Sequence, residues 1–439
     1  MASGTWLRWL GAAVVAAAIV VALFATGTLH LPGGGKAASA VNIIEWVNPP
    51  AVSATRAVDQ GFTKAADVTV HLTTASGRAT NYAALEKTSV EAGSQDIMAV
   101  FPIQPYPHGM PEADLSSEQL WGVKGVYADL SGQPWAKNLL SASRAAQTYN
   151  GKLYGLNTGV YQIGIFYNKA VFAKHHLTPP TTYSAFLALC RTLKADGVQP
   201  LYYATAGGAD GYDWVMVMDS QLMALWRGNV DQQFWSGHGS FTDPRFIQAL
   251  DQARTILRYA EPNWQGQNWT GMPGAFASGK AAMLLDGSWD MASVLAANPT
   301  MQIGYFPLPG SNTASQNQSI LQPDLTWTVL KNAKNKANAL KWLDYFARPA
   351  VYAKYVKATG ISPSFQGSFP SATRGILGSY LSKGLLEANA EPALPNAGPF
   401  GLQPSNFYAT LQNVLDGQRP VRSTAAQWEA QWRQMLASK

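Results

Sequence analysis

Few residues in the chain have the type and spacing that catalysis or metal binding requires. The single cysteine, Cys190, lies in AFLALCRTLK, where apolar residues recur at helical spacing, so a buried structural thiol is predicted and not a nucleophile. The adjacent His175 and His176 have no Cys, Glu or third His at ligand spacing, which indicates an exposed loop and not a metal site. The 26 acidic residues form no recognisable pair of acid and nucleophile. We therefore expect a protein without enzymatic activity, metal or cofactor.

Aromatic side chains are abundant in this sequence, and charged side chains are scarce. There are 15 Trp and 18 Tyr, whereas charged residues make up only 13% of the chain, about half the usual quarter. With 47% hydrophobic residues among 439, the chain can build the cores of two or three folding units, which excludes a disordered or coiled-coil protein. The formal net charge of +6 includes Arg8 and Lys36 of the first forty residues, and no basic run follows. We therefore expect no nucleic-acid partner.

The N-terminal segment predicts export. Trp9 to Ala25 is nearly all Ala, Val, Leu, Ile and Gly, and it follows the basic Arg8, a pattern typical of a signal peptide or a single membrane anchor. Residues 1–40 are interpreted as this segment plus a linker. A small-residue cleavage site, Ala38-Ser39-Ala40, follows at an unusually long distance. Cleavage and retention both stay open, so the protein is expected outside the cytoplasm, either secreted or attached to the cell surface through this segment.

Strand-like and helix-like segments alternate from Val41 onward. The expected strands are residues 41–47, 67–76, 96–102, 162–168, 199–205, 281–286, 302–309 and 326–331. The expected helices are residues 53–66, 80–93, 180–197, 244–260, 273–283 and 338–359, with a helical end from about Ser405. The initial strand-helix-strand-helix-strand series predicts a largely parallel sheet flanked by helices, with ligands at the carboxyl ends of the strands.

Four stretches follow one another in an order that is typical of one family. Gly93 to Val100 has a Gly-x-x-Asp strand start, and Tyr149 to Leu201 has a Gly-Lys-x-Tyr-Gly turn, a strand ending in Tyr-Asn-Lys and Pro-x-Thr at a helix start. Phe276 to Val294 contains Phe-x-x-Gly-x-x-Ala-Met followed by Gly-x-Trp, and Lys331 to Ser364 has a strand, helix and return loop. Together they resemble the family 1 extracellular solute-binding proteins, the maltose-binding-protein-like sugar-binding components of bacterial ABC importers. The resemblance covers roughly residues 41–439.

This resemblance implies an α/β protein with a two-lobed, class II periplasmic-binding-protein-like fold. Three hinge crossings would join the lobes around a ligand cleft, near Asn157 to Tyr161, Gln322 to Trp327 and Thr359 to Pro363. The implied N-lobe comprises residues 41–158 and 329–358, and the implied C-lobe residues 161–322 and 364–439. The chain departs from the family in lacking the lipoprotein cysteine common in Gram-positive members, which leaves the mode of anchoring open.

The chemistry of sugars and the resemblance together select candidate ligand contacts. A neutral sugar has apolar C–H faces and a rim of hydroxyls, so its site needs flat aromatic rings beside carboxylate, amide or Tyr groups. Trp289 matches the tryptophan that stacks on sugar in the family. The other candidates are Tyr161 and Gln162 at the first crossing, Trp46 at the end of the first strand, Asp324 and Trp327 at the second crossing, Tyr212 and Trp214 after the run 199–205, and Phe407 or Tyr408 in the last helix.

Each of these assignments has a structural alternative. Trp289 and Trp46 could pack in a lobe core, Tyr161 and Gln162 could form a solvated turn, and Asp324 could cap a loop. Asp96, in contrast, is expected to brace the start of its strand.

Capture of a solute without chemistry is the function that the resemblance implies. A monomer would close on a neutral sugar or oligosaccharide and deliver it to the membrane subunits of an ABC permease, whose ATPase must be a separate chain because no GxxxxGK[ST] loop is present. One alternative is a sugar-sensing ectodomain held by an uncleaved anchor. Another is a secreted glycoside hydrolase, which needs two cleft carboxylates about 5 to 10 Å apart.

Overall fold

The computed structural model describes residues 39–47, 49–76, 81–101, 103, 112, 115–206, 212–226, 230–369, 371, 373–380, 385–386 and 404–437. The chain divides into two units, Met1–Ser39 and Ala40–Lys439. The predicted export segment lies outside the described residues. Within the described ranges, no helix is both long enough and apolar enough to cross a bilayer.

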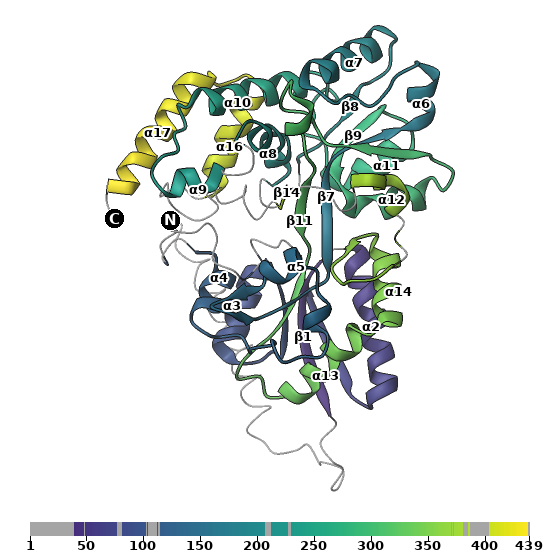
Figure 1. Cartoon of the computed structure of the whole chain (residues 1–439), viewed down its shortest axis with the longest axis vertical. Helices are drawn as coiled ribbons and strands as arrows, with labels where there is room; N and C mark the ends of the chain where they lie inside the picture. Colours follow the sequence, from purple (N-terminus) through teal and green to yellow (C-terminus); the bar gives the residue numbers. More distant parts are fainter. Residues whose placement is uncertain are drawn as a thin grey trace, which may run out of the picture. The chain divides into compact units, whose positions relative to one another are not determined.

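The first sheet begins with three parallel strands. Its order is β2 (Thr69–Ala75), β1 (Ala40–Trp46), β3 (Ile97–Val100), β12 (Thr326–Val329) and β6 (Leu156–Asn157). β1 runs parallel to β2 and β3, as the alternating sequence pattern predicts, whereas β12 runs antiparallel to both β3 and β6. The chain therefore returns to this sheet late, to add a strand from a distant part of the sequence. We call this sheet and the helices packed on it the first lobe (Figure 1); the helices are α2 (Pro49–Ala66), α3 (Ala83–Ala92), α4 (Ser117–Val123), α5 (Ser141–Ala145), α13 (Lys336–Phe346) and α14 (Pro349–Thr359).

The second sheet is built around the ten-residue strand β7 (Gly159–Asn168). Its order is β14 (Leu385–Leu386), β11 (Ile320–Pro323), β7, β9 (Met283–Gly287) and β8 (Leu201–Tyr202), and β7 also pairs with β10 (Ile303–Phe306) and β13 (Ser362–Pro363). Every strand that pairs with β7 runs antiparallel to it. We call this sheet and its helices the second lobe; the helices are α6 (Lys169–Lys174), α7 (Tyr183–Ala195), α8 (Tyr212–Trp226), α9 (Val230–Trp235), α10 (Pro244–Leu257), α11 (Met272–Ala277), α12 (Met291–Ala297), α15 (Arg374–Leu377), α16 (Pro404–Leu415) and α17 (Val421–Ala437).

The remaining elements are short. They are the hairpin strands β4 (Thr148–Tyr149) and β5 (Lys152–Leu153) and the 3-10 helices η3 (Ala136–Asn138), η4 (Trp269–Gly271), η5 (Ser288–Asp290), η6 (Ala314–Gln316) and η7 (Gly378–Tyr380).

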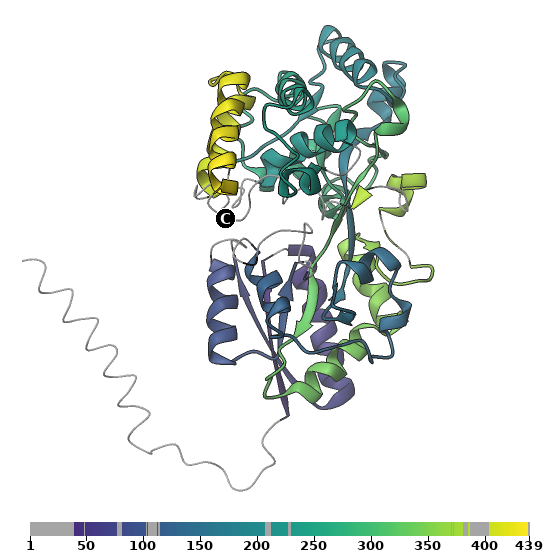
Figure 2. The ribbon, with the colours of Figure 1, turned by 60° about the vertical axis from the view of Figure 1, so that its left-hand side comes forward.

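The second sheet is covered on both faces, and its sequence reflects this. Met283 and Leu285 of β9 join one apolar core with residues of α7, α8, α10, α16 and α17, whereas Leu284 between them joins another core with α11 and α12. Successive side chains of a strand point to opposite faces, so a strand buried on both sides must be apolar at every position. Figure 2 shows α16 and α17 standing against the helices of this lobe.

Several helices differ from the sequence-based expectation, and two of them show why. The helix expected over residues 273–283 ends at Ala277, because Gly279 adopts φ +78°, which turns the chain into β9. Helix α8 was not expected at all. Its described side chains from Met216 to Ala224 are buried without interruption, so the helix lacks the alternation of apolar and polar faces by which a surface helix is recognised.

Asp96 fastens three segments of the first lobe. Its carboxylate accepts hydrogen bonds from the backbone amides of Asn42 in β1, at 2.8 Å, and Asn335 before α13, also at 2.8 Å. The side-chain amide of Asn335 adds a third at 3.0 Å. The expected bracing role of Asp96 is confirmed, and it extends to a segment 239 residues away in sequence.

Substitution Asp96→Ala should lower the free energy of unfolding by about 2 to 4 kcal/mol, because it leaves several partly buried donors without an acceptor. Urea denaturation measures the loss. The Asp251→Ala variant, at an exposed position within α10, is the matched control and should change stability by less than about 1 kcal/mol. Equal stability of the two variants would contradict the bracing role.

Candidate functional site

The chain passes between the two sheets at three places that lie together. The first passage is Thr158, between β6 and β7, and the second is Asp324 and Leu325, between β11 and β12. The third is Gly360 and Ile361, between α14 and β13. β11 and β13 both pair with the start of β7, and Figure 1 shows β7 and β11 running side by side through this region. All three passages therefore meet at one end of β7.

Hydrogen bonds join the first two passages. The Thr158 hydroxyl donates to the Asp324 carboxylate at 2.8 Å, and the Asp324 amide donates to the carbonyl oxygen of Gly159 at 2.9 Å. The side-chain amide of Asn157 donates to the Asp324 carbonyl oxygen at 2.8 Å. All these side chains are buried. The two passages thus form one connected unit of backbone and side chains.

The third passage is fastened to the first through side chains of α14 and the segment after it. Tyr352 donates from its hydroxyl to the Thr158 carbonyl oxygen at 2.8 Å, and the Ser364 hydroxyl donates to the Asn157 carbonyl oxygen at 2.6 Å. The Ser362 hydroxyl donates to Oε1 of Gln162 at 2.9 Å. Gln162, a candidate ligand contact, is fully buried in this network. Its contact with a ligand stays a prediction.

The pKa of the Asp324 carboxyl group is raised above its ordinary value. Burial raises its pKa to about 6, although hydrogen bonds from the Leu325 backbone, Thr158 and Tyr161 act in the opposite direction. Tyr161 shares this environment, and burial together with the nearby Asp324 raises the pKa of its hydroxyl well above the ordinary value. Both side chains were candidate ligand contacts, and the contacts seen here are with the protein itself.

Two further buried carboxyls lie in the first lobe. Burial raises the pKa of Glu45 well above its ordinary value; a hydrogen bond with Thr55 opposes this, whereas Asp59 and Asp324 raise the pKa further. Burial also raises the pKa of Asp59 to about 7, against the hydrogen bond from the Trp342 indole at 2.8 Å. A raised pKa means that these carboxyl groups lose their protons at higher pH than ordinary ones. The electrostatic repulsion among Glu45, Asp59 and Asp324 is therefore reduced.

Trp289 lies where the apolar cores of the two lobes meet. It belongs to η5, the single turn after β9, and its half-buried side chain packs against both cores. The ring of Tyr161 meets it edge-on, with centroids 5.5 Å apart and an interplanar angle of 88°. Both contacts put a partly exposed tryptophan ring beside the three passages.

Gly287 explains the Gly-x-Trp spacing. A Cβ at this position would overlap the six-membered ring of Trp289, so the ring can fold back over the backbone only because residue 287 has no side chain. The next residue, the half-buried Asp290, has a pKa raised to about 6 by desolvation, and a hydrogen bond with Asp286 acts against this rise. The turn that carries Trp289 is thus fixed by a glycine and a pair of carboxyl groups.

Trp46 and Trp327 were both candidate contacts, and both rings lie in the first-lobe core. Trp327 is fully buried and packs edge-on against Trp342 at 5.1 Å. Trp327 sits on β12 between two neighbouring strands, under α13, and its contact with a ligand stays a prediction. Trp46 is only 8% exposed, and its role as a platform stays a prediction.

Phe101 is a residue that sequence reasoning missed. It follows the carboxyl end of β3, is half-buried, and stacks on Trp46 with centroids 5.2 Å apart and planes 26° apart. The expected strand 96–102 already contained Phe101 close to its carboxyl end, and this position was the available signal.

Four candidate residues lie where side chains are not described. Helix α8 begins at Tyr212 and includes Trp214, and α16 includes Phe407 and its neighbour Tyr408. The side chains of these four residues lie outside the described part of the structure, so their ligand contacts stay predictions.

The cysteine and histidine side chains considered for catalysis or metal binding have contacts within the protein. Cys190 is buried, and burial raises its thiol pKa to about 12, which makes it a poor nucleophile. His175 lies 2.7 Å from the carboxylate of Asp196. Among the described residues, no three His, Cys, Asp or Glu side chains gather where they could hold a metal ion.

The sequence was compared with models of known protein families. The model described as "Bacterial extracellular solute-binding protein" matches residues 46–353, more than half of the chain. The chain belongs to this family. The match confirms the resemblance drawn from the four sequence motifs, and the family consists of binding proteins.

Several characterised relatives of this solute-binding protein are named for sugars. The "Multiple sugar-binding protein" of Streptococcus mutans is 25% identical over 261 residues, which cover 57% of this chain and 60% of the relative. The "Diacetylchitobiose binding protein DasA" of Streptomyces coelicolor is 21% identical over 327 residues, covering 72% of this chain and 74% of the relative. The chain thus matches about three fifths of the length of the Streptococcus mutans relative.

Solved structures confirm the fold class. "SBP RafE in complex with raffinose" superposes with a TM-score of 0.71 at 22% identity, covering 90% of this chain and 99% of that one. A "Chitin oligosaccharide binding protein" gives a TM-score of 0.72 at 19% identity, covering 91% and 99%. The solute-binding protein therefore has the two-lobed α/β fold of class II periplasmic binding proteins.

The raised pKa of Asp324 predicts a pH dependence of stability. The folded pKa of about 6 exceeds the unfolded value of about 3.9, so the folded state binds this proton more tightly. The contribution of Asp324 to stability is complete below about pH 4 and is lost as the pH rises through 6. The unfolding free energy should therefore fall between pH 4.5 and 7.5, and Asp324→Asn, which stays neutral, should reduce this fall by about 2 kcal/mol.

Urea denaturation across this pH range measures the effect. Asp129→Asn is the control, because a hydrogen bond with Ser131 lowers the pKa of Asp129, so its titration falls outside the range. If Asp324→Asn and the unsubstituted protein lose stability in parallel, the carboxyl of Asp324 is not the titrating group.

Proposed function

We propose that this protein captures a neutral sugar or oligosaccharide outside the cytoplasm and delivers it to an ABC-type permease. The observation that carries the proposal is the position of Trp289, which is partly exposed and touches the apolar cores of both lobes beside the three passages. A flat ring in that position can stack on the C–H face of a sugar while contacting both lobes.

The composition favours a neutral ligand. A charged solute must be matched by ion pairs within its site, since an unpaired buried charge is costly. The carboxyls of Asp324, Asp290 and Glu45 have raised pKa values, so they serve poorly as permanent counter-charges for a cation. The relatives add support, because solved neighbours are described in complex with raffinose and with stachyose.

The three passages would act as hinges. A ligand that touches both lobes binds the closed form better than the open form, and this difference in affinity drives closure. We propose residues 41–158 with 329–358 and residues 161–322 with 364–439 as the two moving bodies. The observed contacts support this division with two adjustments. β12, residues 326–329, pairs only with strands of the first sheet, and Phe365 and Phe369 pack in the first-lobe core, where Phe365 forms a bridge with Leu139. Both segments would move with the first body.

Delivery requires partners outside this chain. We propose that the protein is exported, acts as a monomer and docks on the membrane subunits of the permease, either free or tethered by its N-terminal segment. The family description, extracellular solute-binding protein, supports export. A role without catalysis fits the carboxyls at the site, since Asp286 and Asp290 share a hydrogen bond, whereas a glycosidase separates its pair by about 5 to 10 Å to admit the sugar.

Titration calorimetry against raffinose, stachyose, maltose, chitin oligosaccharides and simple hexoses tests the proposal. We expect at least one of these sugars to bind with micromolar or tighter affinity and to be recovered unchanged. Absence of binding across the panel, or release of new reducing ends, would overturn the sugar-capture function.

Replacing Trp289 with alanine should weaken binding of that sugar about 10- to 100-fold, the usual loss for a central aromatic contact. Gly287→Ala, which keeps every polar group but displaces the ring, should also weaken binding. Calorimetry measures both variants.

The control for this experiment is Trp269→Ala. Trp269 is a half-buried tryptophan of the second lobe that packs against the core on the other face of the sheet, outside the passages. Equal affinities of the Trp289 and Trp269 variants would show that the Trp289 ring does not contact the sugar.

A further inference from the structure

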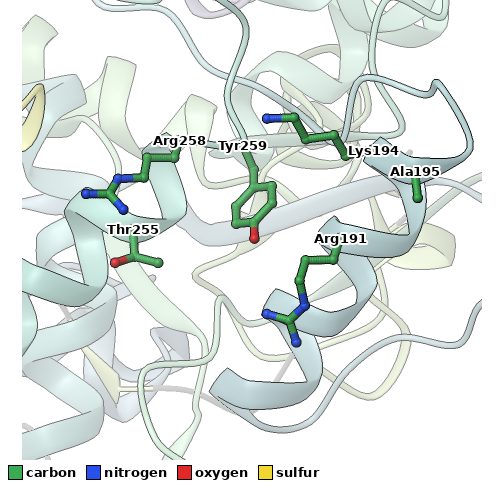
Figure 3. A pocket seen from close by; sticks show the side chains of 6 residues that line it. All are labelled: Arg191, Lys194, Ala195, Thr255, Arg258 and Tyr259. Carbon is green, nitrogen blue, oxygen red and sulfur yellow. The ribbon is translucent and has the colours of Figure 1, made fainter.

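A pocket on the second lobe gathers positive charge away from the hinge contacts. It lies between the C-terminal parts of α7 and α10 and has a volume of about 390 Å³. Figure 3 shows its lining: Arg191, Lys194, Ala195, Thr255, Arg258 and Tyr259. None of these residues takes part in the three passages or the surroundings of Trp289.

The three cations of the pocket lack acidic partners. Within the described part of the chain, Arg191, Lys194 and Arg258 form no ion pair, and no acidic side chain lines the pocket. The nearest acid along α7, Asp196, is engaged by His175 at 2.7 Å. This concentration of unbalanced charge is unusual in a chain with only 13% charged residues.

The pocket is built on a rigid frame. α7 and α10 bury their apolar faces in the same core, through residues such as Leu193 and Leu250. The Thr255 hydroxyl is held by the Asp251 carbonyl oxygen at 2.7 Å, and Lys194 Nζ lies 5.9 Å from the centre of the Tyr259 ring. Basic residues near helix C-termini favour the helix dipole, but this effect does not require the cations of two helices to line one hollow.

We propose that this pocket binds a phosphate group. Two guanidinium groups can each grip phosphate oxygens through paired hydrogen bonds, and a lysine adds a point charge. The Tyr259 hydroxyl, which Figure 3 shows directed toward Arg191, supplies a neutral donor. Three positive charges suit a phosphate better than a single carboxylate, and the volume leaves room for a small polyol attached to it. The phosphate could be soluble or could belong to an anionic lipid headgroup.

The first arm of the test uses soluble probes. Inorganic phosphate and glycerol phosphate are titrated into the full chain at low ionic strength by calorimetry. We expect the double variant Arg191→Gln with Arg258→Gln to weaken binding at least about tenfold, since each removes a charge-assisted hydrogen bond. Lys64→Gln with Arg374→Gln removes the same charge from exposed positions outside the pocket and should leave binding unchanged.

The second arm uses vesicles of phosphatidylglycerol or phosphatidylcholine. The apolar N-terminal segment can itself associate with any bilayer, so the readout is the difference between the pocket variant and the charge-matched control. Soluble binding lost only in the pocket variant supports a soluble phosphate ligand. Without soluble binding, weaker association of the pocket variant with phosphatidylglycerol alone supports a lipid headgroup. If the two double variants behave alike in both arms, the proposal is overturned; sugar affinity, measured in parallel, should be the same in both.

Discussion

The carboxylate of Asp324 lies where two of the three connections between the sheets touch, and the arrangement of the rest depends on it. Its side chain accepts the Thr158 hydroxyl, while its backbone is fastened to Gly159 and Asn157. A carboxylate buried this deeply is stable only when hydrogen bonds replace the lost water. The buried neighbours Thr158 and Asn157 are therefore polar, and their hydrogen bonds hold the first two passages together.

The same junction determines what the site can present. Trp289 can reach both lobe cores because β9 ends beside the start of β7, and because Gly287 leaves space for the ring. The Ser362 hydroxyl donates to Gln162, so part of the polar surface near the passages is already engaged within the protein. The composition of the chain, with few charged and many aromatic residues, agrees with its membership of a family of solute-binding proteins.

Charge is distributed differently in the two parts of the second lobe. Near the hinge, burial raises the pKa values of acidic groups, as for Asp290. On α7 and α10, exposed Arg and Lys side chains surround a hollow without an acidic partner. The first arrangement suits a neutral ligand and the second an anion, so a single lobe can separate two kinds of recognition in space.

The sequence by itself determined the strands and helices with clear patterns and the family, and it selected Trp289 as a candidate contact. These features depend on local periodicity and on short motifs such as Gly-x-Trp, which survive without knowledge of the fold. The sequence could not separate Trp289 from Trp327, because both follow strand-like runs at expected crossings. Only the tertiary structure distinguished the surroundings of the two rings: β12 is enclosed by neighbouring strands and α13, which buries Trp327, whereas η5 places Trp289 at the junction of the lobes. Burial depends on which distant segments pack together, and that information is not local.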